Sequence, residues 1–183
     1  MTGLSPRVKL SAAVLALVMA GAGAQQIAEQ FTSEREGISL TAYQDGVKVW
    51  TICRGRTEGV RAGDVATRAQ CDAWLKADVG QHMASTQRLV RIDLPAPTLA
   101  AYAYTVYNMG PGNFSRNKSG ILAAIRRGDG PAACDLLTDP RMRTAGGRDC
   151  AVRANNCHGV WVARQEARLL CRAGYGELPE GQP

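Results

Sequence analysis

The chain has 183 residues, of which 45% are hydrophobic and 21% are charged, so a wholly disordered protein is excluded. This length fits one domain, or two small lobes that share one chain, with a real hydrophobic core. The formal net charge of +6 favours an acidic partner such as nucleic acid, anionic lipid or a cell wall. Because no Lys/Arg-rich run with interleaved aromatic residues is present, a nucleic-acid partner is not expected.

The chain begins with a segment typical of protein export. Arg7 and Lys9 precede an uncharged, apolar stretch over residues 10–24. Ala22-Gly23-Ala24 matches a signal-peptidase cleavage pattern, so a cleaved signal peptide is one interpretation. The other is an uncleaved anchor, which reaches the about 20 residues of a membrane span only by including residues 25–28. With either interpretation, the rest of the chain is expected to cross the inner membrane and reach an oxidising compartment.

Residues 29–66 are predicted to form a small lobe that contains a β-hairpin. Asp45-Gly46 is a strong turn signal, and Val47, Val49 and Ile52 alternate with other residues beside it. The pattern therefore predicts a little β-structure directly after the export segment, which we assign to residues 1–28.

A long connecting helix is predicted over residues 68–90, because Thr67 and Gln70 form a capping box ahead of apolar residues at helical spacing. Residues 91–174 are predicted to form a larger helical lobe, and residues 175–183 a frayed tail. Within the helical lobe the local signals predict a helix capped by Thr98 and stopped by Gly110, a short helix capped by Ser119 that ends before Gly128, a helix opened by Pro131 that runs through Leu137, a loop over 139–158, and a final helix over 160–171.

The predicted fold class is therefore α+β and mainly α, with two lobes joined by a helix. A groove between two lobes is a natural place for a polymeric substrate.

The chain has an even number of cysteines, and in an exported protein this favours disulfide bonds. A zinc site is the alternative, but it would need close Cys-x-x-Cys pairs or a Cys/His cluster. Cys150 and Cys157 have the tightest spacing and are expected to close a short loop. The six cysteines are Cys53, Cys71, Cys134, Cys150, Cys157 and Cys171.

Two acidic residues lie beside the predicted hairpin, Glu36 before it and Asp45 on its turn. A pair of carboxyl groups is what hydrolysis of a glycosidic bond requires: one acid protonates the leaving oxygen, and the other carboxylate activates water or attacks the sugar. The spacing alone is weak support, because the chain has 16 acidic residues and exposed acids usually serve solvation.

The residues around these acids resemble the active-site segment of phage lysozymes, the T-even lysozyme relatives of glycoside hydrolase family 24. In that pattern a Glu-Gly is followed nine residues later by an Asp and six further on by a Thr, as in Glu36-Gly37, Asp45 and Thr51. The resemblance covers about residues 31–173. It continues in Tyr107-Asn108-Met109-Gly110-Pro111-Gly112-Asn113-Phe114, in Arg127-Gly128-Asp129, and in the block from Cys150 to Arg164.

The resemblance implies a lysozyme-like fold and an inverting muramidase that cuts the β-1,4 bond between N-acetylmuramic acid and N-acetylglucosamine in peptidoglycan. Glu36 would be the general acid, with a pKa raised by burial. Asp45 would hold the attacking water, about 6.5–9.5 Å from the other carboxyl, and Thr51 would help to position it. No metal or cofactor is implied. The candidate substrate-binding residues are Tyr43, Tyr107, Asn108 and Phe114.

The export segment resembles the signal-anchor-release segments of one endolysin subgroup. It implies transient association of residues 8–28 with the host inner membrane, followed by release into the periplasm and refolding. Glu36 lies only 12 residues after Ala24, so a tethered segment is close enough to hold the acid out of register. No cysteine precedes Cys53, which excludes a switch by disulfide exchange within the anchor.

The resemblance also implies the disulfide pairs Cys53–Cys71 and Cys134–Cys171, beside Cys150–Cys157. This chain departs from many relatives at Arg54 and Arg56, where they have His, and at Ser119-Gly120, where they have Ser-Thr. We expect a monomeric endolysin of a phage or prophage of a Gram-negative host. The alternatives are a non-catalytic wall-binding module stapled by disulfides, and a lytic transglycosylase.

Overall fold

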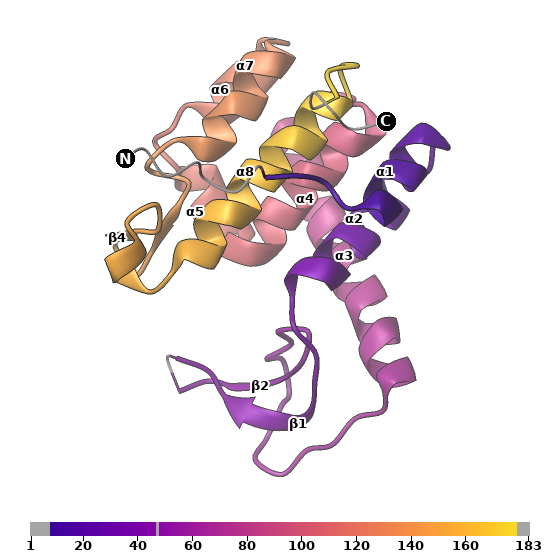
Figure 1. Cartoon of the computed structure of the whole chain (residues 1–183), viewed down its shortest axis with the longest axis vertical. Coiled ribbons are helices and arrows are strands. Elements are labelled where there is room, and N and C mark those ends of the chain that lie inside the picture. Colours follow the sequence, from indigo (N-terminus) through magenta and orange to yellow (C-terminus); the bar gives the residue numbers. More distant parts are fainter. Residues whose placement is uncertain (1–7, 47, 179–183) are drawn as a thin grey trace, which may run out of the picture.

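The protein folds into two lobes joined by one long helix, as the computed structural model in Figure 1 shows. The structure describes residues 8–46 and 48–178. Arg7 and Val47, which entered the sequence predictions, and the end of the predicted tail at 179–183 lie outside the described residues. The helices are α1 (Ala12–Met19), α2 (Ala24–Arg35), α3 (Arg68–Val90), α4 (Ala96–Met109), α5 (Pro111–Arg116), α6 (Ile121–Arg126), α7 (Gly130–Asp135) and α8 (His158–Ala173), and the strands are β1 (Ser39–Gln44), β2 (Trp50–Cys53), β3 (Thr144–Ala145) and β4 (Arg148–Asp149).

The small lobe contains the predicted hairpin, in which β1 and β2 pair antiparallel. Asp45 closes the turn: its backbone N–H donates to Val49 O at 3.0 Å, and its Oδ1 accepts from the Val49 N–H at 2.9 Å. An Asp at this position of a turn bonds its own backbone in this way, which is why Asp-Gly signalled the hairpin. The expected loop over 139–158 is partly wrong, because it holds a second hairpin of β3 and β4.

The connecting helix α3 has the predicted bounds. Its capping box is complete, since Thr67 Oγ1 accepts from the Gln70 N–H at 3.2 Å and Gln70 Oε1 accepts from the Thr67 N–H at 2.8 Å. The helix runs from the small lobe to the helical lobe (Figure 1), so it sets the spacing of the two lobes.

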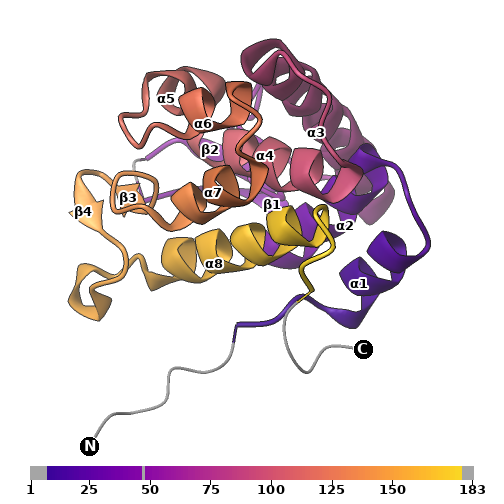
Figure 2. The same ribbon diagram turned by 90° about the horizontal axis from the view of Figure 1, so that it is seen from above.

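α4 is the central helix of the large lobe and is covered by α2, α3 and α8 (Figure 2). The prediction that Thr98 caps this helix is wrong. Pro97 lies in the first turn, where its fixed φ suits a helix start, so α4 begins at Ala96. The Thr98 hydroxyl instead donates to Cys171 O at 2.8 Å and ties α4 to α8. Ser119 likewise stands one residue before the N-cap of α6, which is Gly120.

The N-terminal segment packs into the same hydrophobic core as the large lobe. Leu10, Val14 and Leu15 are buried together with Ile27 and Phe31 of α2. α2 crosses the boundary expected between residues 28 and 29, and Figure 2 shows α1 beside the helical lobe. Among the helices that the structure describes, none combines the length and the apolar composition that crossing a membrane requires.

All six cysteines form disulfides, in the pairs that the resemblance and the loop spacing predicted. Cys53–Cys71 joins β2 to α3, Cys134–Cys171 joins α7 to α8, and Cys150–Cys157 closes a short loop. The cysteines of the first pair are 18 residues apart, and this disulfide links the small lobe covalently to the connecting helix. The cysteines of the second pair are 37 residues apart, and this disulfide links two helices of the large lobe.

Candidate active site

Glu36 is the C-cap of α2, at the point where the chain leaves the large lobe for the hairpin. Burial raises the pKa of its carboxyl above the ordinary 4.5, and the nearby Arg164 guanidinium opposes this effect. Glu36 Oε2 lies against Gly55, where an added Cβ would be 3.9 Å from it. Gly55 has φ +93°, a backbone conformation that glycine adopts without strain, so the loop after β2 can approach the acid closely.

Arg164 of α8 is held rigidly beside the acid. Its side chain is only 2% exposed, its Nε donates to Met142 O at 2.8 Å, and its Nη2 donates to Asn108 Oδ1 at 2.9 Å. Nη1 has no hydrogen-bond partner among the described residues. A fixed cation next to a desolvated carboxyl favours the charged, deprotonated form of that carboxyl.

Asp45 and Thr51 lie on the one hairpin that follows Glu36. Thr51 is 4% exposed and stands opposite Tyr43 in the strand register. Its hydroxyl donates to Val49 O at 3.1 Å, which leaves the oxygen free to accept a hydrogen bond. Tyr43 is 44% exposed and can present its ring to a ligand. The β-turn and the strand pairing thus bring three predicted site residues onto one small element.

Two of the predicted substrate-binding residues on α4 lie near the acid. The Tyr107 hydroxyl donates to Arg54 O at 2.7 Å, and burial together with the charge of Glu36 raises the pKa of this phenol. Asn108 is exposed and holds Arg164. Phe114 is different: it is fully buried and packs beside Tyr102 at a centroid distance of 6.3 Å. Its prediction as a substrate contact is wrong, because the aromatic ring of this motif serves the core.

Arg54 orients the end of α2. Its Nη1 donates to Ser33 O at 2.7 Å and to Glu36 O at 3.4 Å, and its Nη2 lies 3.7 Å from Asp72 of α3. A cation at a helix C-terminus bonds the free carbonyls and complements the helix dipole. Sequence reasoning noted Arg54 only as a departure from the relatives and missed this role.

Arg56, the second departure, joins the same loop to α3. Its Nη1 pairs with Asp78 at 2.8 Å, and its guanidinium lies 5.3 Å from the centre of the Trp74 ring. A permanently charged side chain thus fixes the loop that contacts the acid.

A third ion pair, Arg35 with Glu166, fastens α2 to α8 immediately before Glu36. No local sequence pattern signalled it, because the two residues are 131 positions apart.

Three comparisons bear on this arrangement. A family model described as phage lysozyme matches residues 33–155. The SAR-endolysin of Escherichia phage 933W is 39% identical over 171 residues, which cover 90% of this chain and 94% of that one. The SAR-endolysin of Escherichia phage N15 is 38% identical over 177 residues, 92% and 97% of the two chains. The crystal structure of the active form of P1 phage endolysin Lyz has a TM-score of 0.71 at 20% identity and covers 97% of this chain and all of that one, a likeness of fold.

Proposed function

The chain belongs to the phage lysozyme family, and from this premise we propose that it is an endolysin that hydrolyses peptidoglycan with Glu36, Asp45 and Thr51 in its active site. The observation that carries the proposal is the environment of Glu36, a carboxyl with a raised pKa, beside a fixed Arg164, at the junction of the two lobes. The alternatives, a silent wall-binding module and a lytic transglycosylase, are not favoured by the family.

In the proposed reaction, protonated Glu36 donates its proton to the glycosidic oxygen between N-acetylmuramic acid and N-acetylglucosamine. Asp45 and the Thr51 hydroxyl hold a water that attacks the anomeric carbon from the opposite face, and Asp45 takes up the proton of that water. The bond to the leaving sugar breaks as the bond to water forms, so the anomeric configuration inverts. Arg164 stabilises the Glu36 carboxylate as it forms.

We also propose that residues 8–28 hold the enzyme at the inner membrane before it acts in the periplasm. The names of the relatives support an anchor that is released. In the released enzyme the apolar residues of the segment have a place in the protein core, which compensates for leaving the lipid. A monomer is the proposed active form.

Clearing of outer-membrane-permeabilised cells tests the acid. Glu36→Gln keeps the size of the side chain but holds no transferable proton, so the rate of clearing should fall by about 100-fold or more. Glu177→Gln, an exposed acid that pairs with Arg172 at the far end of α8, is the matched control and should clear normally. Clearing by Glu36→Gln at the control rate would remove Glu36 from the mechanism.

The reaction products separate the alternatives. Mass spectrometry should find reducing muramic acid ends, made by addition of water. Anhydro sugars would instead identify a transglycosylase, and binding without any product would identify a wall-binding module.

The intact mass of the periplasmic protein tests the N-terminal proposal. A mass that includes residues 1–24 and lacks six cysteine hydrogens is expected. A chain that starts at Gln25 would contradict the anchor, because the segment would then be a cleaved signal peptide.

A further inference from the structure

The loop after β2 is a tight turn that brings Gly55 against the acid. Its two ends are joined by backbone hydrogen bonds: the Ile52 N–H donates to Arg56 O at 2.9 Å, and the Arg56 N–H donates to Ile52 O at 3.0 Å. A Cβ placed on Gly55 would lie 3.9 Å from Glu36 Oε2 and 3.8 Å from the Tyr107 hydroxyl oxygen. The carboxyl of the acid and a phenol of α4 therefore both lie against the tip of this loop.

Tyr107 fixes the tip of the loop to the large lobe. Its hydroxyl donates to Arg54 O at 2.7 Å, across 53 positions of the chain. Burial raises the pKa of this phenol well above its ordinary 10, so the hydroxyl remains a donor throughout the pH range in which a carboxyl titrates. The ring packs edge-on against the His82 ring of α3 at a centroid distance of 5.1 Å, and His82 is itself hydrogen-bonded to Asp78 O. Contacts with the protein thus hold both the ring and the hydroxyl of Tyr107.

Arg54 links this phenol to the acid a second time. Its carbonyl accepts from Tyr107, and its Nη1 donates at 3.4 Å to the backbone carbonyl of Glu36. Without the phenol hydroxyl, the half-buried carbonyl of Arg54 would lose its partner, and this loss favours a movement of the loop toward water. Because Gly55 follows Arg54 directly, such a movement would open the contact with the Glu36 carboxyl.

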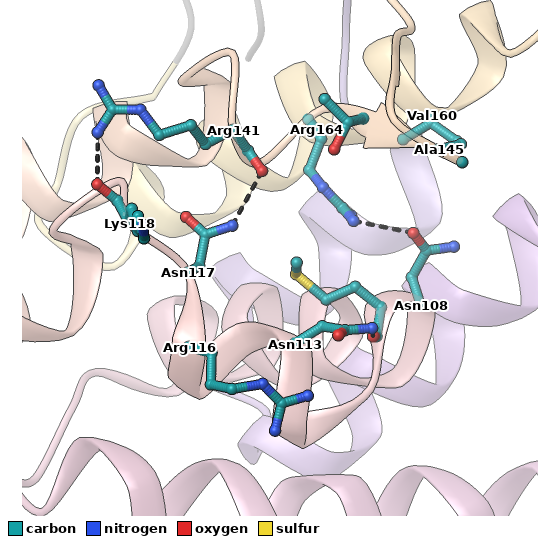
Figure 3. A pocket seen from close by; sticks show the side chains of 12 residues that line it. Asn108, Asn113, Arg116, Asn117, Lys118, Arg141, Ala145, Val160 and Arg164 are labelled. Atoms are coloured by element: carbon teal, nitrogen blue, oxygen red, sulfur yellow. Dashed lines mark hydrogen bonds between the residues drawn. The ribbon is translucent and has the colours of Figure 1, made fainter.

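The next residue of α4 reaches the acid by another route. Asn108 Oδ1 accepts from Arg164 Nη2 at 2.9 Å, and Figure 3 shows this hydrogen bond in the cavity that both residues line. The Arg164 guanidinium lowers the pKa of Glu36, whereas burial, to which the contact with Gly55 contributes, raises it. Two consecutive residues of α4 therefore hold the groups that act on this carboxyl in opposite directions.

We propose that Tyr107 is a positioning residue for the hydrolysis: its hydroxyl holds Gly55 against Glu36, which keeps water away from the carboxyl and keeps its direction fixed. The inference rests on the proposed function, because it concerns the acid of that reaction. It also replaces the interpretation of the hydroxyl as a substrate contact, since the hydroxyl has its partner within the protein. The ring alone remains for a ligand, in a cavity of about 380 Å³ that Tyr107 lines together with Gly55 and His82. Fixing a reacting group in its productive geometry lowers the barrier of the chemical step more than it improves substrate binding.

Tyr107→Phe tests the hydroxyl by itself, because it keeps the ring and the contact with His82. On soluble glycan strands kcat should fall about three- to tenfold, the range expected for one lost hydrogen bond, while KM changes by less than about twofold. Glu36 acts as a proton donor, so activity is lost on the alkaline limb of the pH profile. That limb should move to lower pH by about half a unit, a fraction of the shift of up to about 3–5 units that full burial gives a carboxyl.

Tyr102→Phe is the matched control on the same helix. It also removes one buried hydroxyl, which lies 4.0 Å from Cys134 Sγ in the core of the large lobe. Its kcat and the position of its alkaline limb should equal those of the wild type. An equal change in both variants would overturn the proposal, because the effect would then come from α4 as a whole.

An NMR titration of the Glu36 carboxyl carbon, assigned by comparison with Glu36→Gln, measures the same effect without substrate. In Tyr107→Phe the pKa of Glu36 should be lower than in the wild type and closer to 4.5. A role in stability alone would lower Tm and leave this pKa and the alkaline limb unchanged, and a rise in KM at constant kcat would make the hydroxyl a substrate contact; either result refutes the positioning role. If Tyr107→Phe behaves as the wild type while Glu36→Gln is inactive, the proposed function stands and only the role of Tyr107 is lost.

Discussion

Val14 of α1 gives the sharpest test of whether the N-terminal segment belongs to the folded enzyme. The side chain is fully buried in the core cluster that also contains α2 and α4. Val14→Ala removes two methyl carbons, worth about 1.6 kcal/mol of transfer free energy at about 0.8 kcal/mol each. The unfilled cavity adds a further cost, so the free energy of unfolding should fall by about 2–3 kcal/mol.

Thermal and urea unfolding of the soluble full chain measure this loss. For a chain of this size each kcal/mol lowers Tm by about 2–4 °C, so Tm should fall by about 4–12 °C. The urea midpoint should fall while the slope of the transition stays the same, because the surface exposed on unfolding hardly changes. Far below its Tm the variant should still clear cells.

Met19→Ala is the matched control on the same helix. Met19 is 66% exposed, so its truncation should change the free energy of unfolding by less than about 0.5 kcal/mol. If the two variants unfold at the same temperature, α1 is not packed against the core of the released enzyme. That result would refute the proposal that the apolar side chains of α1 are buried in the core after release.

Three further predictions follow from single features of the structure. Folding raises the pKa of Glu36 above 4.5, so the free energy of unfolding of the wild type decreases as the pH rises through the raised pKa and the buried carboxyl becomes charged. Glu36→Gln cannot become charged, and its Tm near pH 7 should therefore be higher than that of the wild type. In a pH series of thermal scans this difference in Tm should vanish toward pH 4. Replacing both cysteines of Cys134–Cys171 by alanine should lower the free energy of unfolding in urea by about 4 kcal/mol, and replacing those of Cys150–Cys157 by about 2 kcal/mol. The reason is that a disulfide that closes a longer loop removes more entropy from the unfolded chain. Equal losses would contradict this entropic explanation. Arg56→His should keep the ion pair with Asp78 only at a pH where the imidazole is protonated. The ratio of its clearing rate at pH 8 to that at pH 5.5 should therefore be lower than the same ratio for the wild type. An unchanged pH profile would show that this ion pair does not hold the loop after β2.

The parts of the fold that could be predicted are those specified by neighbouring residues. The capping box at Thr67 and the Asp45-Gly46 turn act over three or four positions, and both formed as predicted. The spacing of Glu36, Asp45 and Thr51 was recognisable for the same reason, since the three residues lie within one short segment that runs from the end of α2 through the hairpin.

The contacts that orient the acid could not be predicted, because they join residues far apart in the chain. Arg54 reaches Ser33 across 21 positions, and Arg164 reaches Asn108 across 56. Periodicity gives no information about such pairs. Phe114 shows the opposite error: a residue of a functional motif was predicted to touch the ligand, although its large apolar side chain gains more from burial.

The last turn of α2 connects the N-terminal segment to the chemistry. The Ser33 carbonyl accepts a hydrogen bond from Arg54. The Glu34 carboxylate accepts one at 2.8 Å from the hydroxyl of Ser11, the residue that also caps the N-terminus of α1. Arg35 pairs with Glu166, and Glu36 follows at once. If α1 lay in a lipid bilayer, this turn would lose its Ser11 contact, and the core would lose the side chains that cover Ile27 and Phe31. A carboxyl needs fixed neighbours to keep a raised pKa and a set direction, so we expect the docking of α1 and the raised pKa of Glu36 to depend on the same turn of helix.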